Sequence, residues 1–216
     1  QIDGPYDNLP GFEYVDIKYS VGDFDVVNRY AQFPNGEKGV LPRILMNLLK
    51  ARKETRARIK TEPNAFKRST LNGQQLAYKV TANSLYGQCG ASTSQISLKP
   101  IAASTTAVGR QMLHFAKDFV LEHYKDSEIV YGDTDSIFVN FHPKDENGKP
   151  YKGKEALKKS IVIAEDVEKN INPHFKKPQY LEYEKTFWPF ILFSKKRYIG
   201  NKYEFKTGEK DFKQTS

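Results

Sequence analysis

Two aspartates separated by a single threonine stand out in the segment Tyr131-Gly-Asp-Thr-Asp-Ser136. Two carboxylates this close repel each other, so one of them takes up a proton unless a cation lies beside them. Mg²⁺ suits such oxygen ligands and keeps coordination positions open for phosphate oxygens. Asp133 and Asp135 are therefore candidate ligands of a divalent metal. The alternative is a solvated turn, because Asp and Gly favour turns for local reasons.

A second group of polar residues follows a helical spacing. Lys79, Asn83 and Tyr86 are spaced i, i+4, i+7, so they share one face of a helix predicted to end near Tyr86. Two cations, Arg52 and Arg56, extend the apolar stripe of the helix before it. Cations that converge from two helices need an anion, and a nucleotide triphosphate would satisfy three or more donors at once.

The alternative for these cations is a solvated basic helix. Residues 50–70 hold eight Lys and Arg against two Glu, and such a charge run is often simply exposed to water. A third basic run, Lys195-Lys196-Arg197-Tyr198, follows an apolar segment. Basic and aromatic side chains on a strand grip a nucleic-acid backbone through its phosphates. A basic edge strand that resists aggregation has the same composition, so both interpretations stay open.

Hydrophobic periodicity and turn residues predict the elements that position these side chains. An apolar stripe with helical spacing begins at Leu41, and a turn follows at residues 61–64. Two long helices joined by that turn form a helical hairpin. The carboxylates lie at a tight turn between two β-rich runs. The predicted elements are strands within 12–33 joined at Gly22-Asp23, helices at 41–61, 65–86, 102–124 and 155–170, and strands at 128–131, 136–141 and 180–203.

The composition is that of a globular chain, and its basic balance suggests a polyanionic partner, although many ordinary proteins have a similar charge. The 216 residues are 38% hydrophobic and 28% charged, and 34 Lys and Arg against 26 Asp and Glu give a net charge of +8. The single cysteine, Cys89, excludes an internal disulfide, which predicts an intracellular protein. The longest apolar run, Phe187–Phe193, is interrupted by Pro189 and is short of the roughly 20 residues that cross a membrane. It is predicted to be a buried strand.

Three segments together resemble three ordered motifs of the family B DNA polymerases. They are Lys79-Val-Thr-Ala-Asn-Ser-Leu-Tyr-Gly87, Tyr131-Gly-Asp-Thr-Asp-Ser136 and Lys195-Lys-Arg-Tyr198. Residues 39–53 and 71–77 also resemble the fingers of the eukaryotic delta-type enzyme and its relatives in large DNA viruses. Gln88-Cys89 departs from the cellular delta pattern and favours a viral source. The resemblance covers the chain from about Tyr14 to Gly200.

The resemblance implies an α+β fold, in which a polymerase palm of antiparallel sheet and packed helices carries a fingers subdomain made of an antiparallel helical hairpin. The implied subdomains are palm strands at 1–38, fingers at 39–99, palm with the carboxylate hairpin at 100–197, and the start of the thumb at 198–216.

The resemblance also implies a role for each candidate residue in two-metal phosphoryl transfer. Asp133 and Asp135 would be the catalytic carboxylates that hold two Mg²⁺ ions, with Asp135 the more direct ligand and Glu184 an acidic residue near the metals. Tyr86 would check the nascent base pair. The residues implied to contact the incoming triphosphate are Arg52, Arg56, Lys79 and Asn83, and those implied to hold the DNA duplex are Lys195, Lys196, Arg197 and Tyr198.

The sequence lacks one family motif that polymerase activity requires. The family palm also needs an Asp from an upstream Asp-x-x-Ser-Leu-Tyr-Pro-Ser motif, and no such string lies between Gln1 and Gly39. The upstream exonuclease motifs are missing as well, and the chain begins at Gln1 rather than Met. We therefore expect a piece of a longer polymerase that makes little or no DNA by itself.

The expected partners are primer-template DNA, dNTPs, the remainder of the polymerase chain with its exonuclease, further palm and thumb, and a processivity factor, with no membrane. A viral enzyme would work in the host nucleus or in a cytoplasmic virus factory. Two other classes compete with this interpretation: a non-catalytic nucleic-acid-binding module that keeps the polymerase fold, and another two-metal nucleotide enzyme such as a cyclase.

Overall fold

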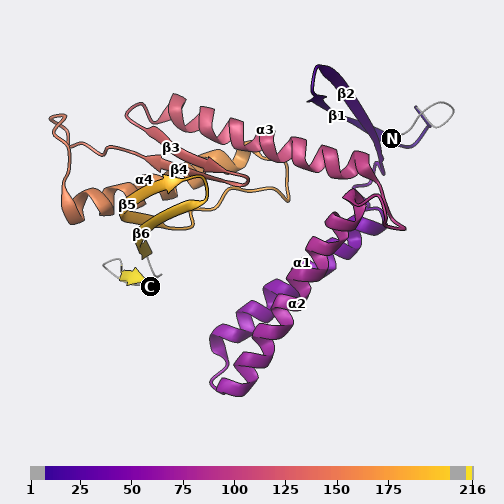
Figure 1. The fold of residues 1–216 in the computed structure, drawn as a ribbon, viewed down its shortest axis with the longest axis horizontal. Coiled ribbons are helices and arrows are strands. Elements are labelled where there is room, and N and C mark those ends of the chain that lie inside the picture. The colour runs from indigo at the N-terminus through magenta and orange to yellow at the C-terminus, as the bar shows by residue number, and fades with distance from the viewer. Residues whose placement is uncertain (1–7, 205–212, 216) are drawn as a thin grey trace. The chain divides into compact units, whose positions relative to one another are not determined.

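The computed structural model describes residues 8–204 and 213–215 (Figure 1). The chain divides into two compact units, residues 1–108 and 109–216, which are described separately below. The predicted palm segment 1–38 and thumb segment 198–216 each lie partly outside the described residues. The elements are β1 (Glu13–Val21), β2 (Phe24–Gln32), α1 (Val40–Thr61), α2 (Ala65–Gly90), α3 (Lys99–His123), β3 (Glu128–Asp133), β4 (Ser136–Asn140), α4 (Gly153–Ile171), the 3₁₀ turn η1 (Asn172–His174), β5 (Thr186–Ser194), β6 (Arg197–Glu204) and β7 (Lys213–Thr215).

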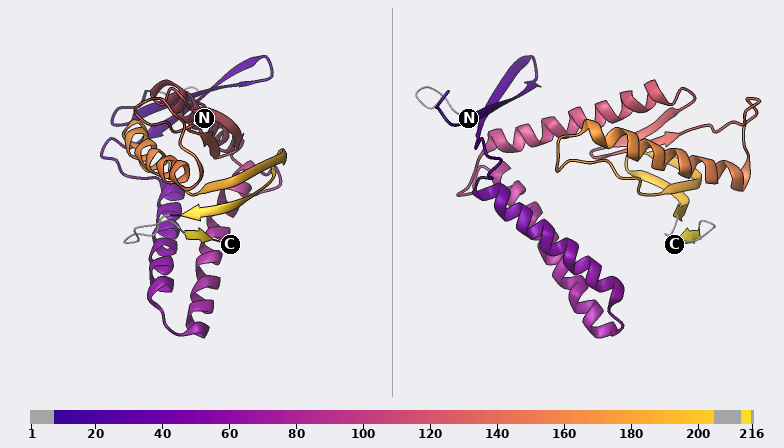
Figure 2. Two further views of the ribbon diagram at one scale, coloured as in Figure 1. Left: turned by 90° about the vertical axis from the view of Figure 1, so that its left-hand side faces the viewer. Right: turned by 180° about the vertical axis from the view of Figure 1, so that it is seen from behind.

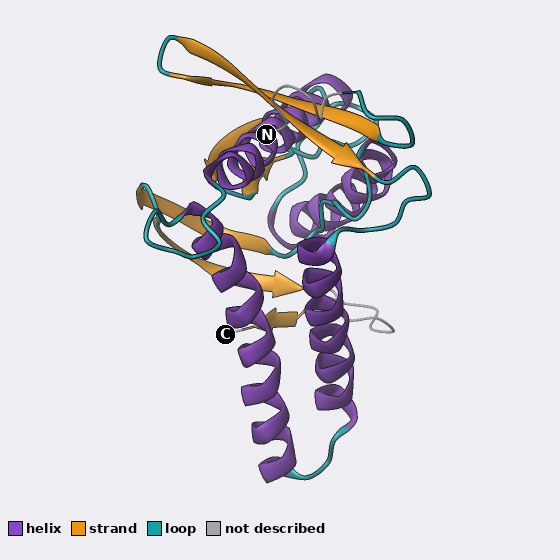
Figure 3. Cartoon of the chain, turned by 90° about the vertical axis from the view of Figure 1, so that its right-hand side faces the viewer, coloured by secondary structure: helices purple, strands orange, loops and turns teal. Residues whose placement is uncertain are grey.

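The first unit contains the predicted helical hairpin. The helices α1 and α2 run antiparallel and side by side, joined by a short turn (Figures 1 and 3). Asn64 caps α2, because its side-chain oxygen accepts the backbone N–H of Lys67 at 3.1 Å. Thr55 of α1 and Leu71 of α2 are buried on the inner faces of the hairpin. Of the apolar stripe predicted from Leu41 onward, Leu41, Leu45 and Leu48 are partly buried, whereas Ile44 and Leu49 are 41% and 54% exposed.

The strands β1 and β2 form a separate antiparallel hairpin in the first unit. Its turn is Gly22-Asp23, as predicted, and Gly22 has a φ of +60°, which glycine adopts without strain. Asn28 of β2 is almost fully buried. Its amide nitrogen lies 2.9 Å from the hydroxyl of Tyr19, 2.9 Å from that of Ser104 and 3.1 Å from the carbonyl oxygen of Pro100. This buried amide ties the β-hairpin to the first turns of α3.

The core of the second unit lies between helices and the β3–β4 hairpin. The second half of α3 packs against α4 through Ala116, Phe119 and Ile171, and Ile137 of β4 packs against this cluster (Figure 2). Val120 and Ile161 are also fully buried. The apolar side chains of α4 lie along one face of the helix. Burial of that face sets which side of α4 points toward the core of the second unit.

Replacing Ile161 with alanine should lower the free energy of unfolding by about 2–5 kcal/mol, because the missing methyl groups leave a cavity in a fully buried position. The matched control is Val162→Ala at the next residue of α4, which is 54% exposed and should change stability by less than about 0.5 kcal/mol. Urea denaturation of the three proteins measures both values. Equal effects of the two substitutions would contradict the assigned packing of α4.

Five aromatic rings connect the two β-hairpins of the second unit. The ring of Phe138 lies 5.4 Å from that of Tyr131 and 5.2 Å from that of Tyr198, measured between centroids. The rings of Phe187 and Phe190 complete the group, at 6.2 and 5.5 Å from Phe138. The contacts among these rings hold the β5–β6 hairpin against the strands that carry the carboxylate turn.

The structure corrects several predicted boundaries and one burial assignment. The strand expected from Tyr180 begins only at Thr186. The apolar run Phe187–Phe193 is a strand, as predicted, but it is not buried: Phe193, for example, is 70% exposed. The mixed α+β content and antiparallel pairing are confirmed, although the described strands form three separate sheets rather than one. None of the described helices is long and apolar enough to span a membrane.

Candidate functional site

The turn between β3 and β4 presents the two predicted carboxylates. Asp133 ends β3 and pairs with Ser136, so that Thr134 and Asp135 form a two-residue turn. Thr134 adopts a positive φ of 49°, which a residue other than glycine rarely does. Its hydroxyl donates to Oδ1 of Asp133 at 3.0 Å, and the Ser136 hydroxyl donates to the Asp133 carbonyl at 3.2 Å. Local hydrogen bonds therefore hold the turn in this conformation.

A lysine from a distant part of the sequence neutralises one of the two carboxylates. The ammonium group of Lys196 lies 2.7 and 2.6 Å from the two oxygens of Asp133. The backbone N–H of Lys196 donates to the Tyr131 hydroxyl at 2.8 Å. Lys196 is one of the residues predicted to contact DNA, and in the described structure its ammonium group contacts Asp133. The hydrogen bond from Lys196, assisted by that from Thr134, lowers the pKa of Asp133, and the same contact raises the pKa of Lys196.

Replacing Lys196 with glutamine should raise the pKa of Asp133 toward the ordinary aspartate value, because the variant lacks the hydrogen bond that lowers this pKa most. Since the folded pKa of Asp133 is depressed, the stability that Lys196 confers is fully present above the ordinary aspartate pKa and disappears as the pH falls through the depressed value. A titration of the Asp133 side-chain carboxyl carbon by NMR measures the change.

The control for this titration is Lys195→Gln, which removes a charge that acts on Asp133 only through space. It should move the pKa of Asp133 upward by less than Lys196→Gln does. If both variants titrated alike, the direct contact between Lys196 and Asp133 would be refuted.

Asp135 faces a different environment from Asp133. Within residues 8–204, no hydrogen bond or ion pair engages the Asp135 carboxylate, and the residue lines a cavity of about 480 Å³. Glu184, Tyr198 and the acidic Glu182 line the same cavity. An open carboxylate at the edge of a cavity is the arrangement that a Mg²⁺ ion with phosphate ligands requires.

The third predicted acidic residue, Glu184, does not complete a metal cluster. It lies in the segment before β5, is 74% exposed, and its carboxylate accepts from the ammonium of Lys185 at 3.1 Å. Across the described part of the chain, no group of three His, Cys, Asp or Glu side chains is placed to hold a metal ion. The donors present are the hard oxygens that Mg²⁺ prefers, but protein carboxylates alone give an incomplete shell, so phosphate oxygens would have to supply other ligands.

The predicted nucleotide-binding residues lie on the helical hairpin of the first unit. Arg52 is half-buried on α1, and its Nε donates to the side-chain oxygen of Gln75 on α2 at 3.3 Å. Tyr86 is partly exposed, and its hydroxyl lies 2.8 Å from that of Thr106 on α3. Of the predicted nucleotide-binding residues, Arg56, Lys79 and Asn83 are exposed and make no carboxylate contact in the described structure.

The predicted DNA-binding run lies half in a turn and half in a strand. Lys195 and Lys196 connect β5 to β6, and Lys196 has a positive φ of 65°. Arg197 begins β6 opposite Ser194, and Tyr198 belongs to the aromatic group described above. Lys195 and Arg197 remain exposed and can contact a phosphate backbone, whereas Lys196 and Tyr198 have partners within the unit.

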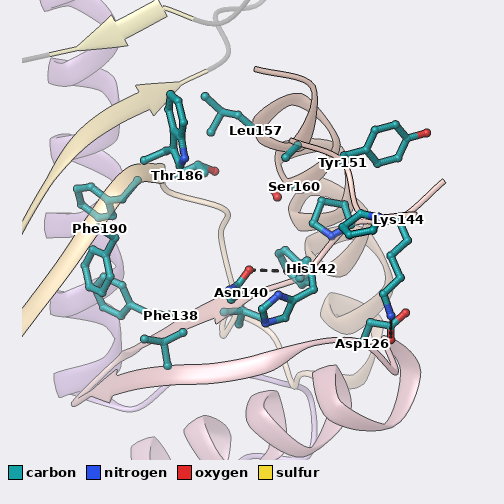
Figure 4. A pocket seen from close by; sticks show the side chains of 18 of the residues that line it. Asp126, Phe138, Asn140, His142, Lys144, Tyr151, Leu157, Ser160, Thr186 and Phe190 are labelled. Carbon is teal, nitrogen blue, oxygen red and sulfur yellow. Dashed lines mark hydrogen bonds and ion pairs between the residues drawn. The ribbon is translucent and has the colours of Figure 1, made fainter. Parts of the chain in front are cut away.

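A larger cavity, of about 870 Å³, contains none of the predicted site residues. It lies between β4, α4 and β5 of the second unit, and its lining is largely apolar and aromatic (Figure 4). Two polar contacts lie at its edge: Nε2 of His142 lies 3.2 Å from a carboxylate oxygen of Glu128, and Lys144 forms an ion pair with Asp126 at 2.6 Å. No sequence motif marks this cavity, because its lining comes from side chains scattered over some 65 residues.

Comparisons with known proteins identify the family of the chain. The family profile of DNA polymerase family B matches residues 8–216. The chain is 45% identical to a DNA polymerase of Pyramimonas orientalis virus over 94% of this chain and 21% of that protein. It is 38% identical to the DNA polymerase delta catalytic subunit of Candida albicans over 79% of this chain and 17% of that protein.

A solved structure is similar as well. The family B DNA polymerase of the archaeon Pyrobaculum calidifontis superposes with a TM-score of 0.50 at 25% identity, over 80% of this chain and 20% of that one. The chain thus spans about a fifth of the length of these relatives. The resemblance seen in the sequence is confirmed: the chain belongs to DNA polymerase family B.

Proposed function

We propose that these 216 residues form part of a DNA-directed DNA polymerase that extends a primer 3′-hydroxyl with dNTPs during DNA replication. The observation that carries the proposal is the β3–β4 turn. In a chain of this family, the turn presents one carboxylate that is neutralised by Lys196 and a second, Asp135, that is open beside a cavity. A catalytic metal site needs such an open carboxylate.

Asp135 would hold Mg²⁺ directly, and Asp133 would lie beside it, in a site for two ions. When bound, the ions supply the charge that activates the primer hydroxyl and neutralises the leaving pyrophosphate. Asp133 orients the turn through Thr134 and Lys196. Glu184, which lines the same cavity as Asp135, would add negative charge near the ions.

The helical hairpin would bind the incoming nucleotide. Its exposed cations have no carboxylate partner of their own in the described structure, so a triphosphate can take that place, with Arg56 assisting one turn beyond Arg52. The hydroxyl of Tyr86 is held by Thr106, which restricts the ring and suits it to check the shape of a base pair. The residues that would contact the triphosphate are Arg52, Arg56, Lys79 and Asn83, and Lys195 and Arg197 would contact the duplex.

The 216 residues alone should make little or no DNA, because the upstream palm aspartate motif is absent from them. We propose that a longer polymerase chain supplies that motif, an exonuclease and a thumb, and that a processivity factor assists it. The host nucleus or a cytoplasmic virus factory would be the place of replication for a viral enzyme.

Primer extension with Mg²⁺ and all four dNTPs tests the proposal on that longer polymerase and on the 216-residue chain side by side. Templated synthesis by the longer protein alone is the expected result. Binding of DNA without synthesis by either protein would favour a non-catalytic binding module, and a template-independent cyclic product would favour a cyclase.

A further inference from the structure

The tip of the helical hairpin carries a cluster of cations and one aromatic ring that the proposed polymerase site does not use. The hairpin tip comprises the last turn of α1, the connecting residues 62–64 and the first turn of α2. Every residue from 63 to 70 is exposed. The side chains that define this surface are Arg58, Lys60, Phe66, Lys67 and Arg68.

Helix stability does not account for all of these cations. Arg58 and Lys60 lie at the C-terminal end of α1, where positive charge interacts favourably with the helix dipole. Lys67 and Arg68 lie near the N-terminal end of α2, where positive charge is unfavourable, and that first turn holds no acidic residue. None of the four contacts a carboxylate in the described structure. Their charges are therefore available to an external anion.

The exposed ring of Phe66 indicates which class of anion this surface could bind. Phe66 is 81% exposed, the most exposed large hydrophobic side chain among the described residues. A simple anion or an acidic peptide needs cations but no aromatic surface. Single-stranded nucleic acid is bound by the combination found here, in which cations contact the backbone and an aromatic ring stacks on a base.

On α2, the residues assigned to the triphosphate lie far from the hairpin tip, whereas on α1 Arg56 lies two residues before Arg58. Arg68 precedes Lys79 by 11 residues on α2, which is about 16 Å along the helix axis. A nucleotide held at Lys79 would leave Lys67 and Arg68 without an anionic partner. We propose that the hairpin tip is a separate binding surface for single-stranded DNA, with Phe66 as the stacking platform and the four cations as phosphate contacts.

Fluorescence anisotropy with a labelled oligo-dT of about 15 nucleotides tests the proposal on the 216-residue chain, over a range of NaCl concentrations and without Mg²⁺ or dNTP. Because no chemistry is involved, the result is independent of whether the parent protein is a polymerase. The charge variant is R58Q/K60Q/K67Q/R68Q. Its control, K152Q/K169Q/K176Q/K177Q, removes the same charge from exposed lysines of the second unit.

The tip charge variant should bind more weakly, and its plot of log affinity against log salt should be less steep by about 0.7 for each phosphate that is no longer neutralised. Phe66→Ala should weaken binding by about 5- to 150-fold with an unchanged salt slope, as expected for one stacked base. Its control is Phe24→Ala, which removes a ring that is 77% exposed but lies between Asp23 and Asp25.

Equal losses of affinity in the tip charge variant and its control would overturn the proposal, since net charge alone would then explain binding. Equal affinities of Phe66→Ala and Phe24→Ala would also overturn it, and so would competition by poly-glutamate as strong as that by unlabelled oligo-dT. Circular dichroism confirms that each variant retains its helices, and a variant that loses them is replaced by the single substitutions Lys67→Gln and Arg68→Gln, judged by the same criteria.

Discussion

Replacing Asp135 with asparagine in the longer polymerase should lower the rate of primer extension at least about a thousandfold. The open carboxylate would be the direct Mg²⁺ ligand. A catalytic metal ion stabilises the charge of the transition state by several kcal/mol, and each 1.36 kcal/mol or so of activation free energy changes the rate tenfold. The same substitution at Asp133 should cost only about 10- to 100-fold, the size of one charge-assisted hydrogen bond, because Lys196 already neutralises that carboxylate.

Single-turnover primer extension at saturating dNTP measures both variants. Asp118→Asn is the matched control, since it removes an exposed carboxylate of α3 that pairs only with Lys117. It should leave the rate unchanged. A larger loss of rate at Asp133 than at Asp135 would reverse the roles assigned to the two aspartates.

The second large effect is expected on the helical hairpin. Replacing Lys79 with glutamine should lower kcat/KM for the dNTP by about 10- to 150-fold, because a hydrogen bond between charged groups is worth roughly 1.5–3 kcal/mol. Lys79 is exposed and has no carboxylate contact in the described structure, so the loss should come from substrate binding rather than from folding.

Lys50→Gln provides the control for Lys79→Gln. Lys50 is exposed on α1 but does not share the i, i+4 line of Arg52 and Arg56. Steady-state kinetics with varied dNTP should show kcat/KM within about twofold of the unsubstituted enzyme for Lys50→Gln. Similar losses for the two lysines would indicate a general effect of charge and would remove Lys79 from the nucleotide site.

The local elements of this chain could be predicted because their signals lie within a few residues. The helical hairpin follows from an apolar stripe that begins at Leu41 and from the turn at residues 61–64, and the structure places α1 at Val40–Thr61. The turn at Gly22-Asp23 follows from turn chemistry between β-rich runs. The second hairpin turn was predicted at residues 132–135, and the structure extends β3 to Asp133, so that only Thr134 and Asp135 form the turn. The order and spacing of the three motifs indicated DNA polymerase family B, and the comparisons confirm that family.

Contacts between distant residues could not be predicted in the same way. Lys196 lies 63 residues after Asp133, and its sequence motif suggested a DNA contact. The packing of the aromatic group, including Phe138 and Tyr198, and the hydrogen bond from the Lys196 backbone to Tyr131 bring the two turns together. Asn28 carries no sequence signal either, because a buried amide and an exposed one look alike until the acceptors around it are known.

Burial was the least predictable property. The run Phe187–Phe193 has the composition of a core strand, yet the face that carries Phe193 is open to water in the described structure. An apolar composition shows that a segment is able to form part of a core. Whether its side chains are buried depends on which neighbouring elements pack against it. The large cavity beside β5 has the same origin, since its lining residues are set by how β4 and α4 pack.

The single cysteine makes the chain convenient for site-specific labelling. Cys89 is 4% exposed near the end of α2, where its carbonyl accepts the backbone N–H of Leu98 at 2.8 Å. A thiol so covered reacts slowly with maleimide dyes. Cysteines introduced at the exposed positions Lys53 and Lys152 would therefore take up the dyes selectively with Cys89 left in place. Energy transfer between dyes at these two sites would then follow the distance between the first and second units as nucleotide and DNA are added.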